Sequence, residues 1–140
     1  MGGFCGVVSK EDCVFDLFYG TDYHSHLGTH RGGMAVLEPD GTFHRSIHNI
    51  QNTPFRSKFE HDLSAFVGKV GIGVISDTDP QPLVMSSKLG TFAVVTVGLI
   101  ANIEELKKEL FSSNCVQLQY STTSGMVGQT EIISALIATR

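Results

Sequence analysis

The sequence predicts an α+β fold in a single domain, residues 1–140. Its 140 residues are 41% hydrophobic and 17% charged, which is enough for a chain of this length to bury a core without disulfides or metals. Segments rich in β-branched residues, which favour strands, occur among segments whose apolar residues recur at helical spacing. A domain that mixes sheets and helices is therefore expected.

A strand and a helix are expected at the start of the chain. Residues 4–9 form a short apolar run that is typical of a buried strand. Asp12 can cap a following helix, which Gly20 would end. The apolar face of that helix is formed by Val14, Phe15, Leu17 and Phe18. Residues 20–33 contain four glycines and three histidines, and this composition favours a surface loop.

A β-hairpin and a second helix are expected next. Asp40-Gly41 separates two short β-rich segments, 34–37 and 42–47, and an Asp-Gly pair supplies the backbone angles of a tight hairpin turn. A helix ended by Gly68 is predicted after Pro54, because four apolar residues share one helical face. These residues are Phe59, Leu63, Phe66 and Val67.

The second half of the chain alternates strands and helices. Residues 70–75 and 91–97 are dense in β-branched residues and poor in charge, which predicts two central strands. Asn102 and Glu105 form a capping pattern that predicts a helix to about Ser112. Residues 113–128 are polar and predict a loop with one strand near 116–120. A last helix starts at Gln129 or Thr130 and continues to the end of the sequence, which suggests a fragment of a longer protein.

Charge and cysteine content argue against several classes of partner. Ten Lys and Arg against fourteen Asp and Glu, with no basic run, give no footprint for a nucleic acid or an anionic membrane. Three cysteines, Cys5, Cys13 and Cys115, are an odd number and do not suggest a disulfide framework. Neither a signal peptide nor an apolar run of about 20 residues is present. A cytoplasmic location is the expectation.

Cys5 is the first candidate for chemistry. A free thiol with a pKa near 8.5 is mostly protonated at neutral pH and needs a base. An N-terminal cysteine carries its own base, because its α-amine has a pKa of about 7.7 to 8.0. This chemistry is available to Cys5 only if residues 1–4 are removed. The structural alternative is a cysteine that packs as a small apolar residue in a strand.

Histidines and acidic residues suggest a metal site only weakly. His24, His26 and His30 lie within seven residues, and imidazole is a common metal ligand. No acidic or cysteine ligand stands at a suitable spacing, so solvated or hydrogen-bonded histidines are favoured and no metal or other cofactor is expected. Asp77-Thr78-Asp79 is interpreted as a solvated turn between strands.

Six short motifs occur in the order and with the approximate spacing found in class II glutamine amidotransferases. They are Cys5-Gly6-Val7-Val8, His30-Arg31-Gly32, Gly71-Ile72-Gly73-Val74, Gln81-Pro82, Gly98 with Asn102-Ile103-Glu104-Glu105-Leu106, and Thr130-Glu131-Ile132-Ile133. The chain resembles this family, and within it most resembles the N-terminal glutaminase domain of amidophosphoribosyltransferase. The resemblance runs from Cys5 to the end of the chain.

The resemblance implies an N-terminal-nucleophile hydrolase fold, in which two sheets pack face to face between helix layers. The present chain would be part of such a domain. In the family, the N-terminal cysteine attacks the side-chain amide of glutamine, and the released ammonia supplies purine synthesis. The ammonia is used by a phosphoribosyltransferase domain, which would follow residue 140. Glutamine or a related amide is the implied partner, and a homo-oligomer stays open.

The family's active site can be mapped onto this sequence. Cys5 corresponds to the nucleophile, with residues 1–4 as a propeptide, and the backbone N–H of Gly98 corresponds to an oxyanion donor. His30, Arg31 and Gly32 correspond to the loop that shapes the pocket.

Three substrate-binding positions depart from the family pattern. Ser76 stands where the family's arginine grips the α-carboxylate of glutamine, and Val97 replaces the oxyanion asparagine. Gln129 replaces the acid that receives the substrate ammonium, unless Glu131 substitutes for it. Loss of one oxyanion donor alone costs about 10² to 10³ in rate.

Three interpretations of function follow. The first is a divergent paralogue with weak or lost glutaminase activity. The second is an inactive binding or regulatory module on the same fold. The third is an amidohydrolase of altered specificity, whose ligand lacks the α-carboxylate and ammonium of glutamine.

Overall fold

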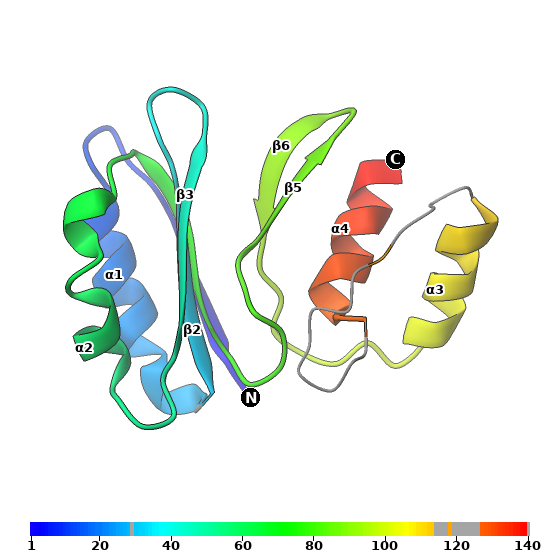
Figure 1. Cartoon of the computed structure of the whole chain (residues 1–140), viewed down its shortest axis with the longest axis horizontal. Coiled ribbons are helices and arrows are strands. Elements are labelled where there is room, and N and C mark those ends of the chain that lie inside the picture. Colours follow the sequence, from blue (N-terminus) through cyan, green and yellow to red (C-terminus); the bar gives the residue numbers. More distant parts are fainter. Residues whose placement is uncertain (29, 114–117, 119–126, 140) are drawn as a thin grey trace.

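The computed structural model describes residues 1–28, 30–113, 118 and 127–139. It confirms the α+β class and arranges the elements in helix, sheet, sheet and helix layers (Figure 1). The larger sheet has four antiparallel strands in the order β1-β4-β2-β3. Its strands are β1 (Gly3–Val8), β2 (Arg31–Leu37), β3 (Phe43–Asn49) and β4 (Val70–Ser76).

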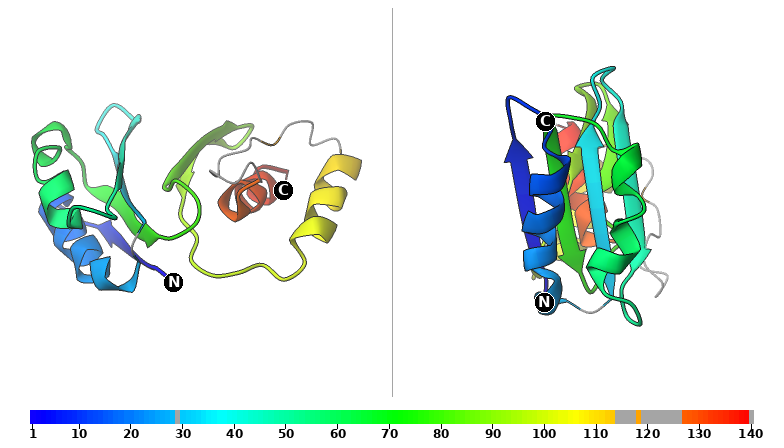
Figure 2. Two further views of the ribbon diagram at one scale, coloured as in Figure 1. Left: turned by 60° about the horizontal axis from the view of Figure 1, so that its bottom comes forward. Right: turned by 90° about the vertical axis from the view of Figure 1, so that its left-hand side faces the viewer.

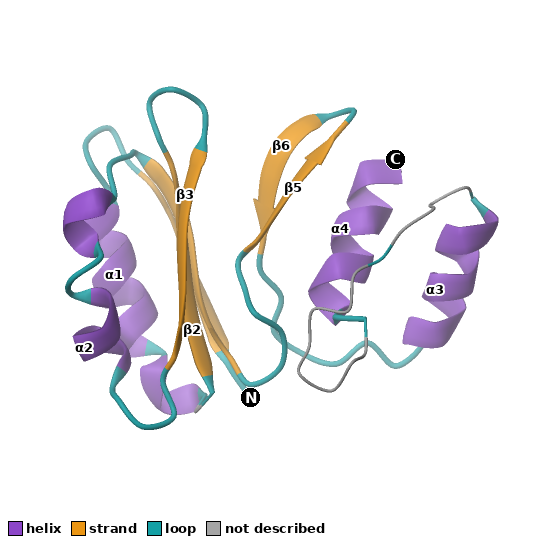
Figure 3. Ribbon diagram, viewed as in Figure 1, coloured by secondary structure: helices purple, strands orange, loops and turns teal. Residues whose placement is uncertain are grey.

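The smaller sheet pairs β5 (Leu83–Ser87) with β6 (Gly90–Val94). Helix α1 (Val14–Tyr23) and the short α2 (Phe55–Phe59) cover the outer face of the larger sheet (Figure 2). Helices α3 (Ile103–Ser112) and α4 (Gln129–Thr139) lie beyond the smaller sheet (Figure 3). Two single 3-10 turns, η1 (Ser25–Leu27) and η2 (Leu63–Ala65), complete the described elements.

The main core lies between α1, α2 and the larger sheet. Leu17 and Phe18 of α1 meet Phe55 and Phe59 of α2 over buried strand residues such as Met34. A second, smaller cluster joins α3 to α4. No helix in the described part of the chain combines the length and apolar character that a bilayer crossing requires.

The hairpin and the fourth strand confirm the sequence predictions. The first strand forms as predicted but is not buried, because β1 lies at the edge of the sheet and exposes alternate residues such as Phe4 and Val8. The hairpin turn contains Gly41 at φ +88°, a left-handed conformation that glycine adopts without strain. Asp40 closes the same turn by accepting hydrogen bonds from the backbone and hydroxyl of Thr42. Strand β4 is central, as predicted, with β1 and β2 on its two sides.

The predicted loop at residues 20–33 is wrong at both of its ends. Helix α1 passes through Gly20 to Tyr23, and residues 31–33 belong to β2. Two of these glycines allow close packing. A side chain at Gly20 would collide with the sulfur of Cys5, and one at Gly32 would collide with the ring of Phe55. Their number therefore reflects close contacts within elements and not a flexible connection.

The predicted helix over residues 59–67 is also wrong. The segment consists of α2, which ends at Phe59, followed by η2. Phe59 and Phe66 are both buried, but they reach the core from two separate turns. Between the turns, Asp62 is held by Ser46 and His48 of β3, and this contact fixes the segment against the sheet edge.

The strand predicted at 91–97 is shorter than expected and is not central. Strand β6 ends at Val94, and its partner β5 was not predicted. Helices α3 and α4 are confirmed, although the Asn102 side chain makes no capping hydrogen bond and its carbonyl accepts instead from Glu105 and Leu106. Most of the predicted 113–128 loop, with its strand near 116–120, lies outside the described residues.

Candidate functional site

A pocket of about 250 Å³ lies where three chain segments meet. Met1 and Gly2 form one wall, residues 75–78 at the end of β4 form the second, and residues 96–99 after β6 form the third. The first two walls adjoin because β1 pairs antiparallel with β4, which sets Gly3 opposite Ile75. The pocket therefore joins the larger sheet to the segment that leaves the smaller one.

Gln81 holds the third wall in place. Its Oε1 accepts the backbone N–H of Thr96 at 2.6 Å, and its Nε2 donates to the Thr96 carbonyl at 3.0 Å. The same amide nitrogen lies 3.4 Å from Ser76 Oγ. Gln81 is 1% exposed, so a single buried side chain ties the wall at 96–99 to the end of β4.

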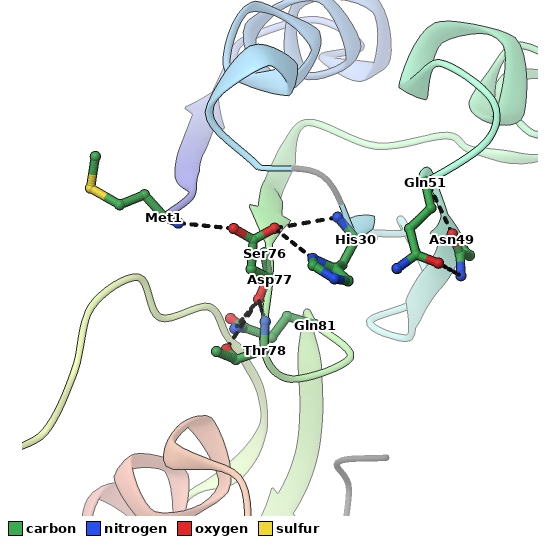
Figure 4. Close-up of polar contacts among 8 residues, drawn as sticks. All are labelled: Met1, His30, Asn49, Gln51, Ser76, Asp77, Thr78 and Gln81. Carbon is green, nitrogen blue, oxygen red and sulfur yellow. Dashed lines mark hydrogen bonds and ion pairs between the residues drawn. The ribbon is translucent and has the colours of Figure 1, made fainter. Parts of the chain in front are cut away.

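Asp77 is the ionisable side chain among the described residues that line this pocket. Its Oδ2 accepts the Met1 ammonium at 2.9 Å. Its Oδ1 lies 3.3 Å from the backbone nitrogen of His30, which donates, and 3.1 Å from Nδ1 of the same ring (Figure 4). The carboxylate is thus oriented on both of its oxygens.

The hydroxyls next to Asp77 form a small local network. Ser76 Oγ accepts the backbone N–H of Thr78 at 3.2 Å and lies 3.3 Å from its Oγ1 (Figure 4). Across the pocket, Gly98 has φ +135°, a conformation in which any larger residue would be strained. The walls consequently present one carboxylate, several hydroxyls and the apolar groups of residues such as Ile75 and Val97.

Some of the site residues predicted from sequence come together here. Ser76, Val97 and Gly98 all line the pocket, although they are far apart in the sequence. His30 reaches its edge through Asp77.

The structure does not bring Cys5 to the pocket. Cys5 lies opposite Gly73 in the middle of the β1 ladder, and its sulfur packs against Gly20 of α1. Burial raises the pKa of the Cys5 thiol, which favours the protonated form. Gly2, not Cys5, is the residue of the first strand region that lines the pocket.

The remaining predicted site residues also lie outside the pocket lining. Arg31 and Gly32 begin β2, and Gly32 lies beneath Phe55. Gln129 uses its side-chain oxygen to accept the backbone N–H of Ile100 at 2.8 Å. Glu131 is buried in α4 at 7% exposure.

Two polar residues of the site were not identified from the sequence. Asp77 was interpreted as part of a solvated turn, and Gln81 was used only as a family motif. The one available signal for Asp77 was its position directly after Ser76. Within the described residues, the histidines form no group of three ligands with cysteine or acidic side chains that could hold a metal.

Comparisons with known proteins identify the fold. No protein-family model matches the chain, and no curated protein matches it. A solved structure of glutamine phosphoribosylpyrophosphate (PRPP) amidotransferase from B. subtilis, complexed with ADP and GMP, matches with a TM-score of 0.77 and 22% identity. A second, described as the allosteric regulatory enzyme of purine biosynthesis, matches with a TM-score of 0.76 and 22% identity.

The described residues have an N-terminal-nucleophile hydrolase-like fold with two antiparallel sheets. The solved structures that share it are PRPP amidotransferases, whose N-terminal domain is the class II glutamine amidotransferase domain. Each match covers 98% of this chain but only 29% of the solved chain. The sequence resemblance is thus confirmed at the level of the fold.

Proposed function

We propose that this chain is a divergent glutaminase-type domain that binds a small ligand in the pocket without hydrolysing glutamine. The observation that carries the proposal is the separation of the Cys5 thiol from the pocket. Glutaminase chemistry of this family needs a thiol and its own α-amine beside the bound amide. Here Gly2 lines the pocket, while Cys5 lies under α1.

Removal of residues 1–4 would not by itself deliver Cys5 to the pocket. Cys5 pairs with Gly73 and is three positions along the strand from the level of Ser76, a distance of about 10 Å at 3.3 Å per residue. A shift by three positions is odd and would turn Cys5 to the opposite face of the sheet, because side chains alternate along a strand. Every pair of the β1 ladder would have to be broken and re-formed.

The positions that depart from the family pattern support the same proposal. Ser76 offers a hydroxyl where a guanidinium would bind a carboxylate, and Val97 offers no oxyanion donor from its side chain. Gln129 is uncharged, and its oxygen is already occupied by the backbone of Ile100. Loss of a single oxyanion donor lowers the rate by about 10² to 10³, so several such changes leave little hydrolysis.

The test is a combined activity and labelling experiment. Ammonia release from L-glutamine is measured, and intact mass is recorded after incubation with 6-diazo-5-oxo-norleucine, which alkylates a glutaminase nucleophile. The proposal expects no ammonia above background and no adduct, with Cys5→Ser indistinguishable from the unmodified sequence. An adduct on Cys5 together with Cys5-dependent ammonia release would overturn it.

The proposal extends to the domain with which this chain works. The solved structures that share the fold are named as PRPP amidotransferases. We propose that the domain works beside a phosphoribosyltransferase domain, as an inactive regulatory or binding module. Co-purification of such a domain with the chain from its host tests this part.

A further inference from the structure

Strand β1 forms one edge of the larger sheet, and this edge is open in the described part of the chain. The strand order β1-β4-β2-β3 gives β1 a neighbour on one side, and its six residues all pair with β4. Figure 2 shows β1 at the margin of the sheet in its right-hand view. The free side of such a strand presents backbone donors and acceptors that a further strand can bind.

The alternation of the β1–β4 ladder identifies the residues that present these groups. Just beyond β1, Ser9 donates its backbone N–H to the carbonyl of Lys69 at 2.8 Å, and this pair continues the β1–β4 register. Hydrogen-bonded pairs alternate with non-bonded pairs along an antiparallel ladder, so Cys5 and Val7 direct their backbone groups toward β4. The residues that direct these groups toward the free edge are Phe4, Gly6 and Val8.

The side chains at these positions lie on the face of the sheet opposite α1. Cys5 packs against Gly20 of α1, and successive side chains of a strand point to opposite faces. Phe4 is 59% exposed and Val8 is 82% exposed, so an apolar strip runs beside the free edge. Strand β1 also lacks the charged residues and prolines that commonly protect an edge strand from pairing.

The opposite edge strand, β3, is protected. It contains Arg45, whose guanidinium donates to the carbonyl of Pro82 at 3.1 Å. Asp62 of the covering segment bonds Ser46 and His48 of the same strand. The two edges of the sheet therefore differ, and β1 is the one that is suited to a partner strand.

A second copy of β1 fits this edge residue by residue. If two copies run antiparallel about a two-fold axis at Gly6, Gly6 lies opposite Gly6 of the second copy and Phe4 lies opposite Val8 of the second copy. Each opposed pair can exchange two backbone hydrogen bonds, which satisfies the free-edge groups of all three residues on both copies. Phe4 and Val8 also form apolar cross-strand pairs on one face, and such pairs stabilise a sheet. A register shifted by two positions separates them.

We propose that two copies of this chain form a symmetric dimer by pairing the free edges of their β1 strands, with Gly6 at the two-fold axis and Phe4 of each copy opposite Val8 of the other. The two four-stranded sheets then become one continuous sheet. A two-fold contact of this kind uses the same surface on both copies and closes at two. The association does not use the pocket or the Cys5 thiol, so it holds whether or not glutamine is hydrolysed.

Amide hydrogen exchange tests the pairing, because neighbouring amides of β1 should respond differently. Exchange and sedimentation are measured from about 20 μM to about 1 mM protein, a range that suits the weak dimer expected of a small, one-strand interface. We expect a concentration-dependent dimer, in which exchange at Phe4, Gly6 and Val8 slows as the dimer fraction rises. Exchange at Cys5 and Val7 should not change with concentration, since their N–H groups point toward β4.

Charge substitutions separate this contact from non-specific association. Val8→Lys places a charge opposite Phe4 of the second copy at both ends of the paired strands, and should raise the dissociation constant at least about tenfold. Leu89→Lys is the matched control, because it adds the same charge at a residue that is 62% exposed between β5 and β6, and it should have no effect. Phe4→Glu combined with Val8→Lys sets opposite charges across from each other and should associate more tightly than either single variant.

Three results would overturn the proposal. The first is a chain that stays monomeric over the whole concentration range. The second is a dimer that Val8→Lys weakens no more than Leu89→Lys does, because its interface would then lie elsewhere. The third is protection of the Phe4, Gly6 and Val8 amides that is independent of protein concentration, which would mean that another segment of the same polypeptide occupies the edge.

Discussion

His48 Nε2 on β3 and Asp62 Oδ2 between α2 and η2 lie 2.5 Å apart. Ser46 Oγ donates to the same oxygen at 2.5 Å. Burial alone would raise the pKa of Asp62, but the hydrogen bonds from Ser46 and His48 and the charges of His48 and His44 together lower it. This carboxylate joins the edge of the larger sheet to the segment that covers it.

Asp62 is expected to make the free energy of unfolding depend on pH in the acidic range. A carboxyl with a depressed folded-state pKa contributes stability that is present above its unfolded pKa, about 3.9, and is lost as the pH falls through the folded value. Asp62→Asn should lower the free energy of unfolding at pH 7 by about 1–3 kcal/mol and flatten its decline below pH 4. Urea unfolding at a series of pH values measures both. Glu105→Gln is the control, and an equally steep acid decline in Asp62→Asn would contradict the prediction.

Gln81 is expected to matter more for stability than an exposed glutamine. Gln81→Ala leaves the partly buried N–H and carbonyl of Thr96 without their side-chain partner, at a cost of about 1–3 kcal/mol. Hydrogen exchange at the Thr96 amide should accelerate in the same variant. Gln51→Ala is the matched control, because Gln51 is exposed and its side chain bonds only Asn49 among the described contacts. Equal effects of the two substitutions would refute the role of Gln81.

The effect of substituting Gly20 on stability should depend strongly on which residue stands at position 5. Gly20→Ala directs a methyl group at the Cys5 sulfur and should destabilise the chain by about 2 kcal/mol through overpacking. When Cys5→Ala removes the sulfur, the Cβ of residue 5 lies 3.5 Å from the new methyl group, an ordinary contact. Gly20→Ala should then be neutral or stabilising by about 0.5–1 kcal/mol, because alanine favours a helix.

Thermal unfolding of the two single variants and the double variant gives this coupling energy directly. Additive effects would mean that the sulfur does not occupy the space beside Gly20, and the position assigned to Cys5 would have to be revised.

Cys5 should react slowly with alkylating reagents. Burial raises the pKa of its thiol, so less of the reactive thiolate is present at neutral pH than in an exposed cysteine. Iodoacetamide labelling, followed by peptide mass mapping, should therefore show slower modification of Cys5 in the folded chain than in urea, with a rate that rises as the pH is raised. A folded-state rate at pH 7 above the unfolded rate would indicate an activated nucleophile instead.

Strands and helices with clear periodicity were predictable from the sequence. The hairpin around Asp40-Gly41 followed from turn chemistry, and β4 followed from its β-branched residues. Residues 20–33 were not predictable in the same way, because the sequence does not distinguish a glycine needed for a turn from one needed for close packing. Gly20 and Gly32 are of the second kind.

Chain order was enough to group some residues that line the pocket, whereas the position of Cys5 depends on strand geometry. Ser76, Val97 and Gly98 were selected by collinear motifs and do meet. The position of Cys5 depends on which face of β1 it occupies, and a short cysteine-glycine motif does not specify that. Asp77 lies beside His30 and the Met1 nitrogen, and the sequence does not indicate that these residues meet.

We expect the two hydrogen bonds between the Gln81 side chain and the Thr96 backbone to limit the size of molecule that can enter the pocket. Its two outer walls belong to segments that follow different sheets, and they are joined by one side chain. A ligand that separates these walls would break the contact between Gln81 Nε2 and Ser76 Oγ or the two hydrogen bonds from Gln81 to the Thr96 backbone. Gln81 lies behind the lining, so its expected effect on ligand size requires no contact with the ligand.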